Sequence, residues 1–563
     1  MKINICALRS FLLIAFFSTA GVSAQQWNGY TLIATQNSTT AKLIDTASAT
    51  YHSWTGLTGS TGYSCYMLPG GTLLRSVTVN NSTFTGGGMT GRVQKVDWNG
   101  TLLWDFTYSS STYCCHHDIC PMPNGNVLLI SYESKTASEV SQAGCQSAIA
   151  MWPDKIVEVQ PTGATTGTIV WEWHLWDHLC QSYNSSANNY VSAVGDHPEL
   201  FNINASVQKE IFHMNGLDYN PMLDQVVFSA HNTNEFYVID HSTTSAEAAS
   251  HSGGRSGKGG DFLYRWGKPS NYGQSGTTIF NVLHDAHWIP EDCPNAGYLV
   301  ALNNKGISNT QSCIDQASPP YNGFNYNYTA NSAYTPSTYT LRQNCTGGTS
   351  NMGNSEQYPN GNMMICLALS GTVYETNSAG TTIWSYTASG TTPQAHRYSA
   401  CYLSNAAPAA PTITSNGNVL TSSAASAYQW YFNGSQIAGA TSQSYTATQT
   451  GTYQVRITDA NGCVYMYSAL LDFTVTSAAD LFTAATEFSL YPNPTNGIVH
   501  IAGDFTSEKN YTVTVTDAVG HVVMQTASQQ SLDLSPLADG IYFVSVSTEQ
   551  KGITTRRIIL SRQ

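Results

Sequence analysis

The chain has 563 residues, too many for one hydrophobic core, so at least two domains are expected. Only 10% of the residues are charged, and 22 basic against 35 acidic residues give a net charge of −13. This balance argues against binding to nucleic acid and to anionic membrane surfaces. With 33 Tyr, 12 Trp and 46 Gly and little helical periodicity, the composition predicts an all-β protein with many tight turns.

Residues 1–24 have the pattern of a signal peptide. Lys2 and Arg9 lie in a short polar start, "FLLIAFF" is the apolar segment, and "VSA" before Gln25 is a small-x-small cleavage pattern. No later stretch approaches the roughly 18 apolar residues that a membrane span needs. We therefore expect an exported protein without a membrane span.

One phrase recurs along residues 25–405. It is a Pro, Gly or Asn turn that leads into an apolar strand, as in "MLPGGTLLRSV" (67–77), "PMPNGNVLLISY" (121–132) and "QYPNGNMMICL" (357–367). Most copies are followed by two further strands, the last rich in tryptophan, as in "GRVQKVDWNGTLLWDF" (91–106). A repeated four-strand unit indicates a β-propeller. Five or six blades fit the spacing, and we predict six.

The composition changes at "AAPAAPTI" (406–413), which has the character of a linker. The segment that follows alternates polar and apolar residues with a period of two and contains "YQWYFNG" and "GTYQV". It resembles the immunoglobulin-like modules of secreted bacterial proteins, so we assign residues 406–478 to a linker and an immunoglobulin-like β-sandwich that acts as a spacer.

Residues 485–563 contain "FSLYPNPTNGIVHI", "LDLSPLADGIYFVSV" and a basic end, "KGITTRRIIL". These stretches resemble the C-terminal sorting domain of the type IX secretion system, a small β-sandwich. The resemblance implies that the type IX machinery is a partner and that the protein is secreted or held at the cell surface.

Thirteen cysteines, twelve of them after residue 24, are compatible with disulfides in an oxidising compartment. Cys463 lies apart from the other eleven, so the spacing does not reveal the pairing, and we expect at least one free or unexpectedly bridged thiol.

Four histidine-containing segments flank the repeated unit. They are "HHDI" (116–119), "HMNGLD" (213–218), "LHDAHW" (283–288) and "QAHRYS" (394–399). Because the inner strands of a propeller meet at one axis, equivalent positions on different blades converge. The sequence therefore predicts one histidine-lined pocket at the axis.

The stretches "HHDICPMPNGNVLLI", "FHMNGLDYNPMLDQVVFS", "GGDFLYRWGKP" and "LHDAHWIP" together resemble the bacterial aryl-sulfate sulfotransferase family. This resemblance implies transfer of a sulfuryl group from an aryl sulfate ester to a phenol, without a nucleotide donor. It implies a transient sulfohistidine at His284, with His117 and His213 beside it. A neutral imidazole is a good nucleophile, and the other rings are acids or bases near neutral pH.

One position departs from that family pattern. His231, in "SAH", stands where the family often has an arginine. Either a charged His231 takes its place, or Arg397 of "QAHRYS" supplies the cation, or the activity is altered.

Other candidates have two readings each. Asp118 and Asp285 orient the neighbouring rings in the substrate pocket or cap turns. His178, in "WDHL", contacts substrate or forms a structural hydrogen-bonded pair with Asp177. "CCHHDIC" (114–120) holds ligand types for zinc, but it lacks the usual spacing, so we expect no metal site and no cofactor.

We therefore predict a six-bladed propeller that is an exported aryl-sulfate sulfotransferase with small-molecule donor and acceptor. Two alternatives remain. One is a non-catalytic surface propeller that binds glycan or protein, and the other is an aryl sulfate hydrolase that uses the same pocket.

Overall fold

A computed structural model describes residues 25–476, 488–503, 510–548 and 552–562, and the predicted signal peptide, residues 1–24, lies outside them. The chain forms two compact units. The first runs to residue 413 and includes residues 422–443 and 452–471; the second contains residues 414–421, 444–451 and those from 472 onward.

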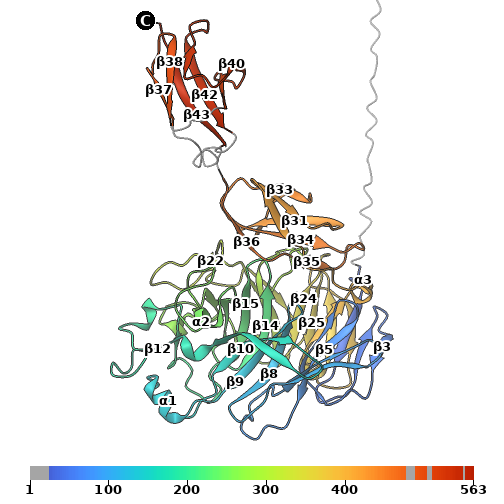
Figure 1. The fold of residues 1–563 in the computed structure, drawn as a ribbon. Helices are drawn as coiled ribbons and strands as arrows, with labels where there is room; N and C mark the ends of the chain where they lie inside the picture. The colour runs from blue at the N-terminus through green and yellow to red at the C-terminus, as the bar shows by residue number, and fades with distance from the viewer. Residues whose placement is uncertain (1–24, 477–487, 504–509, 549–551, 563) are drawn as a thin grey trace, which may run out of the picture. The chain divides into compact units, whose positions relative to one another are not determined.

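Six four-stranded antiparallel sheets make up most of the first unit and form a six-bladed β-propeller, as the sequence predicts (Figure 1). From the inner strand outward, blade 1 is β4 (Thr61–Leu68), β5 (Thr72–Thr78), β6 (Gly91–Val96) and β7 (Leu102–Thr107). Blade 2 is β8 (Tyr113–Pro121), β9 (Val127–Glu133), β10 (Asp154–Pro161) and β11 (Gly167–His174). Blade 3 is β14 (Met214–Asn220), β15 (Gln225–Ala230), β16 (Glu235–Asp240) and β17 (Tyr264–Trp266). Blade 4 is β18 (Leu283–Trp288), β19 (Leu299–Ser308), β20 (Gln311–Ala317) and β23 (Leu341–Asn344). Blade 5 is β24 (Asn354–Gln357), β25 (Met363–Leu367), β26 (Thr372–Thr376) and β27 (Thr382–Thr387).

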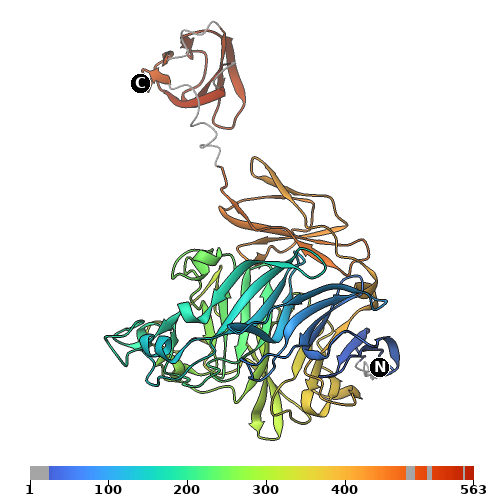
Figure 2. The same ribbon diagram turned by 60° about the horizontal axis from the view of Figure 1, so that its bottom comes forward.

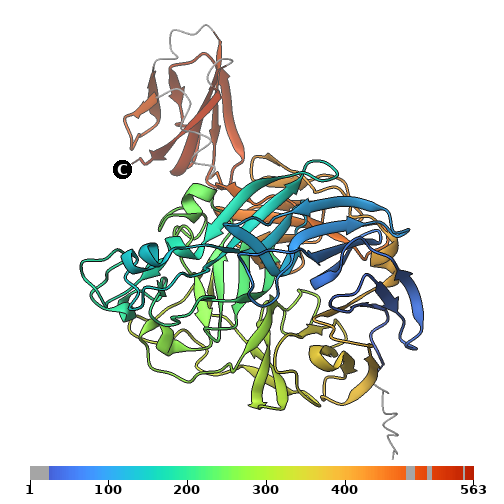
Figure 3. The same ribbon diagram turned by 90° about the horizontal axis from the view of Figure 1, so that it is seen from below.

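The sixth blade closes the ring by combining both ends of the propeller sequence. Its inner strand β28 (Ala395–Tyr398) pairs with β1 (Tyr30–Ala34), which is followed outward by β2 (Ala41–Ile44) and β3 (Thr50–Trp54). In Figure 3 the blue N-terminal strands accordingly lie beside the last strands of the ring. Closure through paired strands leaves no open edge between the first and last blades.

The core consists of six separate layers, one between each pair of neighbouring blades. Strand β25 shows how one short sequence serves two layers. Met363, Ile365 and Leu367 pack toward blade 4, whereas Met364 and Cys366 pack toward blade 6. Because successive side chains of a strand point to opposite faces, a strand buried on both sides must be apolar throughout. This explains the unbroken apolar runs after each turn phrase.

Short elements connect the blades. The helices are α1 (Ala137–Gln142), η1 (Leu175–Asp177), η2 (Val194–Asp196), α2 (Ser245–Ala248), η3 (Pro269–Tyr272), η4 (Ala368–Ser370) and α3 (Ala400–Ser404). The short strands are β12 (Leu179–Cys180), β13 (Phe201–Asn202), β21 (Tyr321–Asn322) and β22 (Asn325–Tyr326). Across the described ranges, every helix is too short or too polar to cross a membrane.

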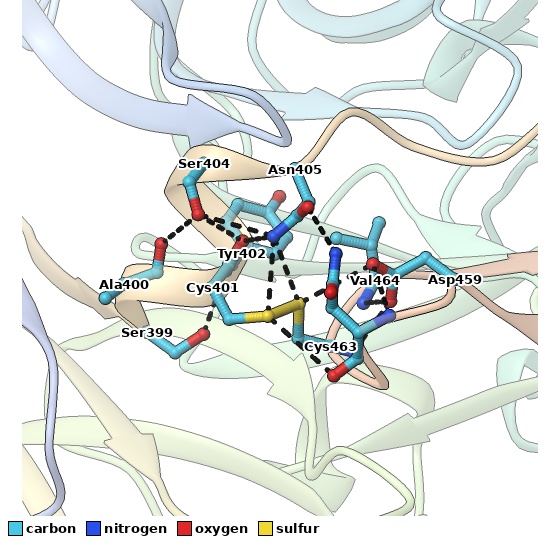
Figure 4. The surroundings of a disulfide bond; sticks show 10 residues. Ser399, Ala400, Cys401, Tyr402, Ser404, Asn405, Asp459, Cys463 and Val464 are labelled. Atoms are coloured by element: carbon cyan, nitrogen blue, oxygen red, sulfur yellow. Dashed lines mark hydrogen bonds between the residues drawn. A yellow bond between two sulfur atoms is a disulfide. The ribbon is translucent and has the colours of Figure 1, made fainter.

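After α3 the first unit gains one more sheet, in the order β32 (Ser435–Gln436), β31 (Ala427–Phe432), β34 (Gly451–Thr458) and β35 (Tyr465–Tyr467). A disulfide between Cys401 in α3 and Cys463 before β35 ties this sheet to the propeller (Figure 4). The remaining ten cysteines of the described residues are buried free thiols.

The second unit is also built from strands (Figure 2). One sheet contains β29 (Ile413–Asn416), β30 (Val419–Ser422) and β33 (Ser444–Thr446), and β36 (Leu471–Phe473) follows β35 along the chain. The C-terminal sheets are β37 (Phe488–Tyr491), β38 (Ile498–Gly503) and β41 (Ser531–Asp533), and β40 (Val522–Ala527), β39 (Tyr511–Thr516), β42 (Gly540–Thr548) and β43 (Gly552–Leu560).

Candidate active site

The inner strands of three consecutive blades are interrupted where the histidines lie. The pairing register shifts between Cys115 and Ile119 in blade 2, and between His284 and His287 in blade 4. His117 and His213 have positive φ angles of 49° and 53°, which non-glycine residues seldom adopt. A bulge frees a side chain from the alternation of the strand and re-aims it, so these irregularities direct the histidines toward the axis.

Four histidine rings lie in a chain at one end of the inner strands. The ring centroids of His117 and His213 are 4.6 Å apart, those of His213 and His231 5.1 Å, and those of His231 and His284 5.8 Å. We call these four residues the histidine cluster. The structure therefore brings together all four residues that sequence analysis names as catalytic candidates.

His116 and Asp154 form a hydrogen-bonded chain that ends at His117. His116 lies with Nε2 3.0 Å from Asp154 Oδ1 and with Nδ1 2.8 Å from Nδ1 of His117. If His116 keeps its proton on the side of Asp154, it accepts at Nδ1 from His117, whose Nε2 then carries the lone pair. Burial, and the nearby charge of His213, hold the pKa of His117 well below its ordinary value.

His213 is held by a carboxylate. Its Nδ1 lies 2.5 Å from Glu210 Oε2, and the hydroxyl of Tyr132 donates to the same carboxylate at 2.9 Å. Burial raises the pKa of Glu210, but the hydrogen bond and charge of His213 outweigh it and lower the pKa to about 2. Glu210 is therefore ionised throughout the neutral range and lies within hydrogen-bond distance of the His213 ring.

His284 is buried and neutral. Burial and the charge of His231 lower its pKa to about 3. Nδ1 donates to Asn304 Oδ1 at 2.7 Å, and Nε2 accepts from the backbone N–H of Met352 at 3.1 Å. The lone pair of this ring is therefore on Nε2, the atom through which the ring would act as a nucleophile.

His231 is half-buried beside His213 and His284, and its Nδ1 lies 2.8 Å from Asn232 Oδ1. Burial, and the charges of His213 and Lys305, lower its pKa. Lys305 is thus near enough to His231 to influence its pKa.

Sequence analysis did not identify three groups of the site. Glu210 lies three residues before His213, and Lys305 follows Asn304 in the strand that supports His284. The third is the glycine run 86–88. An added Cβ would lie 2.3 Å from the His117 ring at Gly88 and 2.6 Å from the His213 ring at Gly87. The run "TGGGMT" was the one available signal, because three consecutive glycines permit a close backbone approach.

The predicted substrate-binding residues lie elsewhere. Asp118 accepts from Tyr66 Oη at 2.8 Å and from Leu217 N at 3.1 Å, and Asp285 accepts from Ser355 N at 2.9 Å. Both carboxylates therefore join inner strands to one another, farther along the axis than the cluster.

Arg397 and His178 are not brought to the cluster. The Arg397 guanidinium pairs with Glu375, and both side chains are fully buried. His178, also fully buried, lies 2.8 Å from Asp261 Oδ1 and 2.8 Å from the carbonyl oxygen of Ala248. His178 is therefore in a structural pair, but its partner is Asp261 and not the expected Asp177. Arg397 does not take the place of the family arginine.

Asp261 also accepts from His251, whose Nδ1 lies 2.7 Å away. His178, His251 and Asp261 are the one group in the described ranges with three metal-ligand atoms close together. The "CCHHDIC" segment places its cysteines in the blade core instead, since Cys114 and Cys115 pack in different hydrophobic layers.

A family model for the arylsulfotransferases matches residues 76–467. The chain belongs to the arylsulfotransferase family. This family match supports a sulfotransferase enzyme that acts on aryl compounds. A second model, for the secretion-system C-terminal sorting domain, matches residues 489–561, which supports secretion or display at the cell surface through the type IX machinery. No curated protein matches the chain.

Several solved structures resemble this arylsulfotransferase-family chain at low identity. A Bacteroides caccae protein of unknown function is 12% identical, with a TM-score of 0.38 over 66% of this chain and 99% of its own. Streptogramin B lyase is 10% identical, with a TM-score of 0.31 over 64% of this chain and 80% of its own. The periplasmic gluconolactonase of Pseudomonas aeruginosa is 10% identical, with a TM-score of 0.27 over 88% of this chain and 100% of its own.

Proposed function

We propose that the histidine cluster transfers a sulfuryl group from an aryl sulfate ester to a phenol through a sulfohistidine at His284, without a nucleotide donor. The observation that carries this proposal is the state of His284, a neutral ring whose Nδ1–H is held by Asn304 and whose lone pair is on Nε2. A neutral imidazole attacks sulfur, whereas an imidazolium does not.

In the first half-reaction, Nε2 of His284 forms a bond to sulfur while the bond between sulfur and the phenolic oxygen breaks. The Met352 N–H must leave Nε2 for this attack. The proton stays on Nδ1, where it is hydrogen-bonded to Asn304 Oδ1. The amide nitrogen of Asn304 donates to the carbonyl oxygens of Thr349 at 3.0 Å and of Met352 at 2.8 Å. This support keeps Asn304 Oδ1 facing the ring.

His213 is placed to act as acid and base, because Glu210 holds its Nδ1 and leaves Nε2 free to exchange a proton with substrate. It gives its proton to the departing phenolate, and in the second half-reaction it takes a proton from the incoming phenol. His117 offers a second acceptor, Nε2, in the same space. A positioned acid or base of this kind contributes about 10²–10⁴-fold to the rate.

The sulfuryl oxygens need positive charge around them, and Lys305 acts beside His231 in place of the family arginine. This assignment differs from both sequence-level options, a charged His231 and Arg397. It favours a neutral His231 that donates a hydrogen bond, with the lysine as the fixed cation.

The division of the chain is part of the same proposal. Residues 1–24 are the signal peptide, residues 25–405 the enzyme, residues 406–478 a linker and immunoglobulin-like module, and residues 485–563 the sorting domain.

The test is the release of 4-nitrophenol from 4-nitrophenyl sulfate by the folded chain, with and without added phenol. We expect phenol to accelerate release and to be recovered as phenyl sulfate, and His284→Gln to abolish both. His197→Gln is the control, since it makes the same replacement at a histidine outside the cluster, 3.0 Å from Glu199 Oε1. If the rate of 4-nitrophenol release is the same with and without phenol, the protein is a hydrolase. If the folded protein releases no 4-nitrophenol, it is a non-catalytic binding propeller.

A further inference from the structure

A cavity of about 670 Å³ lies at the other end of the inner strands. Strand β8 runs from the cluster residue His117 to the cavity residues Cys120 and Pro121, and β18 runs from His284 to Trp288 in the same way. Between the two ends lie the hydrogen bonds of Asp118 and Asp285 that join the inner strands. The cavity is therefore separate from the histidine cluster.

The side of the cavity opposite the propeller blades is formed by the additional sheet of the first unit and the loop before β35. Gly462, Cys463 and Tyr465 line the cavity. The disulfide to Cys401 holds this wall in place. Hydrogen bonds of Asn405, at the end of α3, with Asn461 and Cys463 connect the same two segments (Figure 4). The enclosure is thus a built feature of the fold.

Glu291 fastens the same sheet to blade 4. It accepts hydrogen bonds from Tyr431, from Tyr467 at 2.5 Å and from Arg456 at 2.5 Å. Three donors on one carboxylate, together with the disulfide, fix the sheet over the cavity.

Two histidines in the cavity wall are bound to carboxylates. His287 Nδ1 lies 3.2 Å from Asp285 Oδ2, and His396 Nδ1 lies 2.5 Å from Glu356 Oε1. Burial lowers both pKa values, but the carboxylates outweigh it. The pKa of His287 rises to about 9 and that of His396 rises as well. The His287 ring is therefore cationic near neutral pH, and its Nε2–H is a further donor.

Two polar atoms of the wall have no hydrogen-bond partner among the residues that the structure describes. His396 Nε2 and Ser355 Oγ are buried without a hydrogen bond, although both residues line the cavity and are at most 7% exposed. Buried polar atoms without a partner are uncommon in folded proteins, so these two mark the polar part of the cavity wall.

The remaining wall is mainly aromatic. It contains Trp27, Tyr66, Trp288, Tyr358, Tyr398, Tyr402 and Tyr465. Aromatic walls with a few convergent polar groups bind flat apolar ligands. The polar groups include the carboxylates of Asp218 and Asp292 beside those that hold the histidines.

We propose that this cavity binds a neutral phenolic compound, with its ring against the aromatic wall and its hydroxyl between a histidine N–H and a carboxylate. A phenol both accepts and donates one hydrogen bond, which matches a donor and an acceptor side by side. An aryl sulfate has no hydroxyl proton, so it cannot donate a hydrogen bond to the carboxylate of such a pair. Phenol binding here requires no sulfuryl chemistry at the histidine cluster.

The test is isothermal titration of the full chain with 2-naphthol and with its sulfate ester. A His213→Ala background removes binding at the cluster from the signal. We expect 2-naphthol to bind with one site per chain and the ester to bind about tenfold or more weakly. His287→Gln and Trp288→Leu should each weaken 2-naphthol binding about tenfold.

Tyr465→Ala provides a variant outside the propeller core, and Tyr183→Ala, on an exposed tyrosine, is its control. Tyr465→Ala should weaken binding and Tyr183→Ala should not. The cavity assignment is overturned if 2-naphthol does not bind, if Tyr465→Ala and Trp288→Leu both bind it normally, or if the ester binds as tightly as the phenol. None of these outcomes depends on whether the enzyme transfers sulfuryl groups.

Discussion

Both ends of the propeller axis carry buried histidines, but the pKa values of His117 and His284 at one end and of His287 and His396 at the other are shifted in opposite directions. At the cluster end, burial lowers the pKa values of His117 and His284, whose neighbours are other rings, an amide and backbone groups. At the cavity end, carboxylates raise the pKa values of His287 and His396 despite similar burial. A neighbouring carboxylate, and not burial alone, therefore decides whether a propeller histidine is a neutral nucleophile or a cation.

The largest expected effect is a loss of enzyme activity at the cluster end without a loss of binding at the cavity end. His213→Ala removes the acid from the cluster and leaves Glu210 without its partner. We expect kcat for phenol-dependent release to fall about 10²–10⁴-fold, with 2-naphthol binding at the cavity end retained. Steady-state kinetics and titration on the same preparation measure both, and a decrease of less than tenfold would remove His213 from the mechanism.

The next effect concerns the glycine run over the cluster. Gly88→Ala places a Cβ against the His117 ring at a φ of +63°, whereas Gly100→Ala meets a similarly positive φ with no atom within 4 Å. Both should lose about 1 kcal/mol of stability from the backbone, but only Gly88→Ala should also lose about tenfold or more in kcat/KM. Equal activities of the two variants would show that the close approach is unimportant.

The pH dependence of stability should differ in direction between the two ends. His284 has a folded pKa of about 3 against an ordinary value near 6.5. Between pH 6.5 and about pH 3, His284 is protonated in the unfolded chain and neutral in the folded chain. The free energy of unfolding therefore falls by about 1.4 kcal/mol for each pH unit of acidification. His284→Gln should flatten this acidic slope in urea unfolding.

His287 acts in the opposite direction. Its folded pKa of about 9 means that its stabilisation is fully present below pH 6.5 and is lost as the pH rises to 9. The loss amounts to about 3 kcal/mol at most. His287→Gln should flatten the alkaline slope and leave the acidic slope unchanged. A variant that flattens both slopes, or neither, would contradict the contrast between the two ends.

A smaller effect on function is expected from the disulfide. Replacing Cys401 and Cys463 together by serine should lower the free energy of unfolding by about 2–4 kcal/mol. It should also weaken 2-naphthol binding several-fold, with phenol-dependent release unchanged. Replacing a buried free thiol, as in Cys366→Ser, is the control for loss of a sulfur alone.

The architecture was largely predictable because propeller strands are apolar on both faces and follow one turn phrase. The apolar run of β25 and the turn before it define that blade without knowledge of its neighbours. The pairing of Cys401 with Cys463 was not predictable, because it depends on how a later sheet docks on α3.

The site was predictable only in part. His117, His213 and His284 occupy equivalent positions on successive blades, so their convergence follows from the repeat. Arg397 follows His396 directly, and the alternation of β28 sends their side chains to opposite faces, where Arg397 meets Glu375. A motif lists both residues but does not indicate which one faces the axis.

The central claim is that His284 carries the sulfuryl group. Rapid mixing of the full chain with 4-nitrophenyl sulfate in the absence of phenol, followed by quenching at alkaline pH and peptide mass spectrometry, tests it most directly. A burst of one 4-nitrophenol per chain, with the sulfuryl group on the peptide that contains His284 and on no other, is the predicted result. A burst with the label on His231 or His117, or turnover with no labelled histidine, would contradict it.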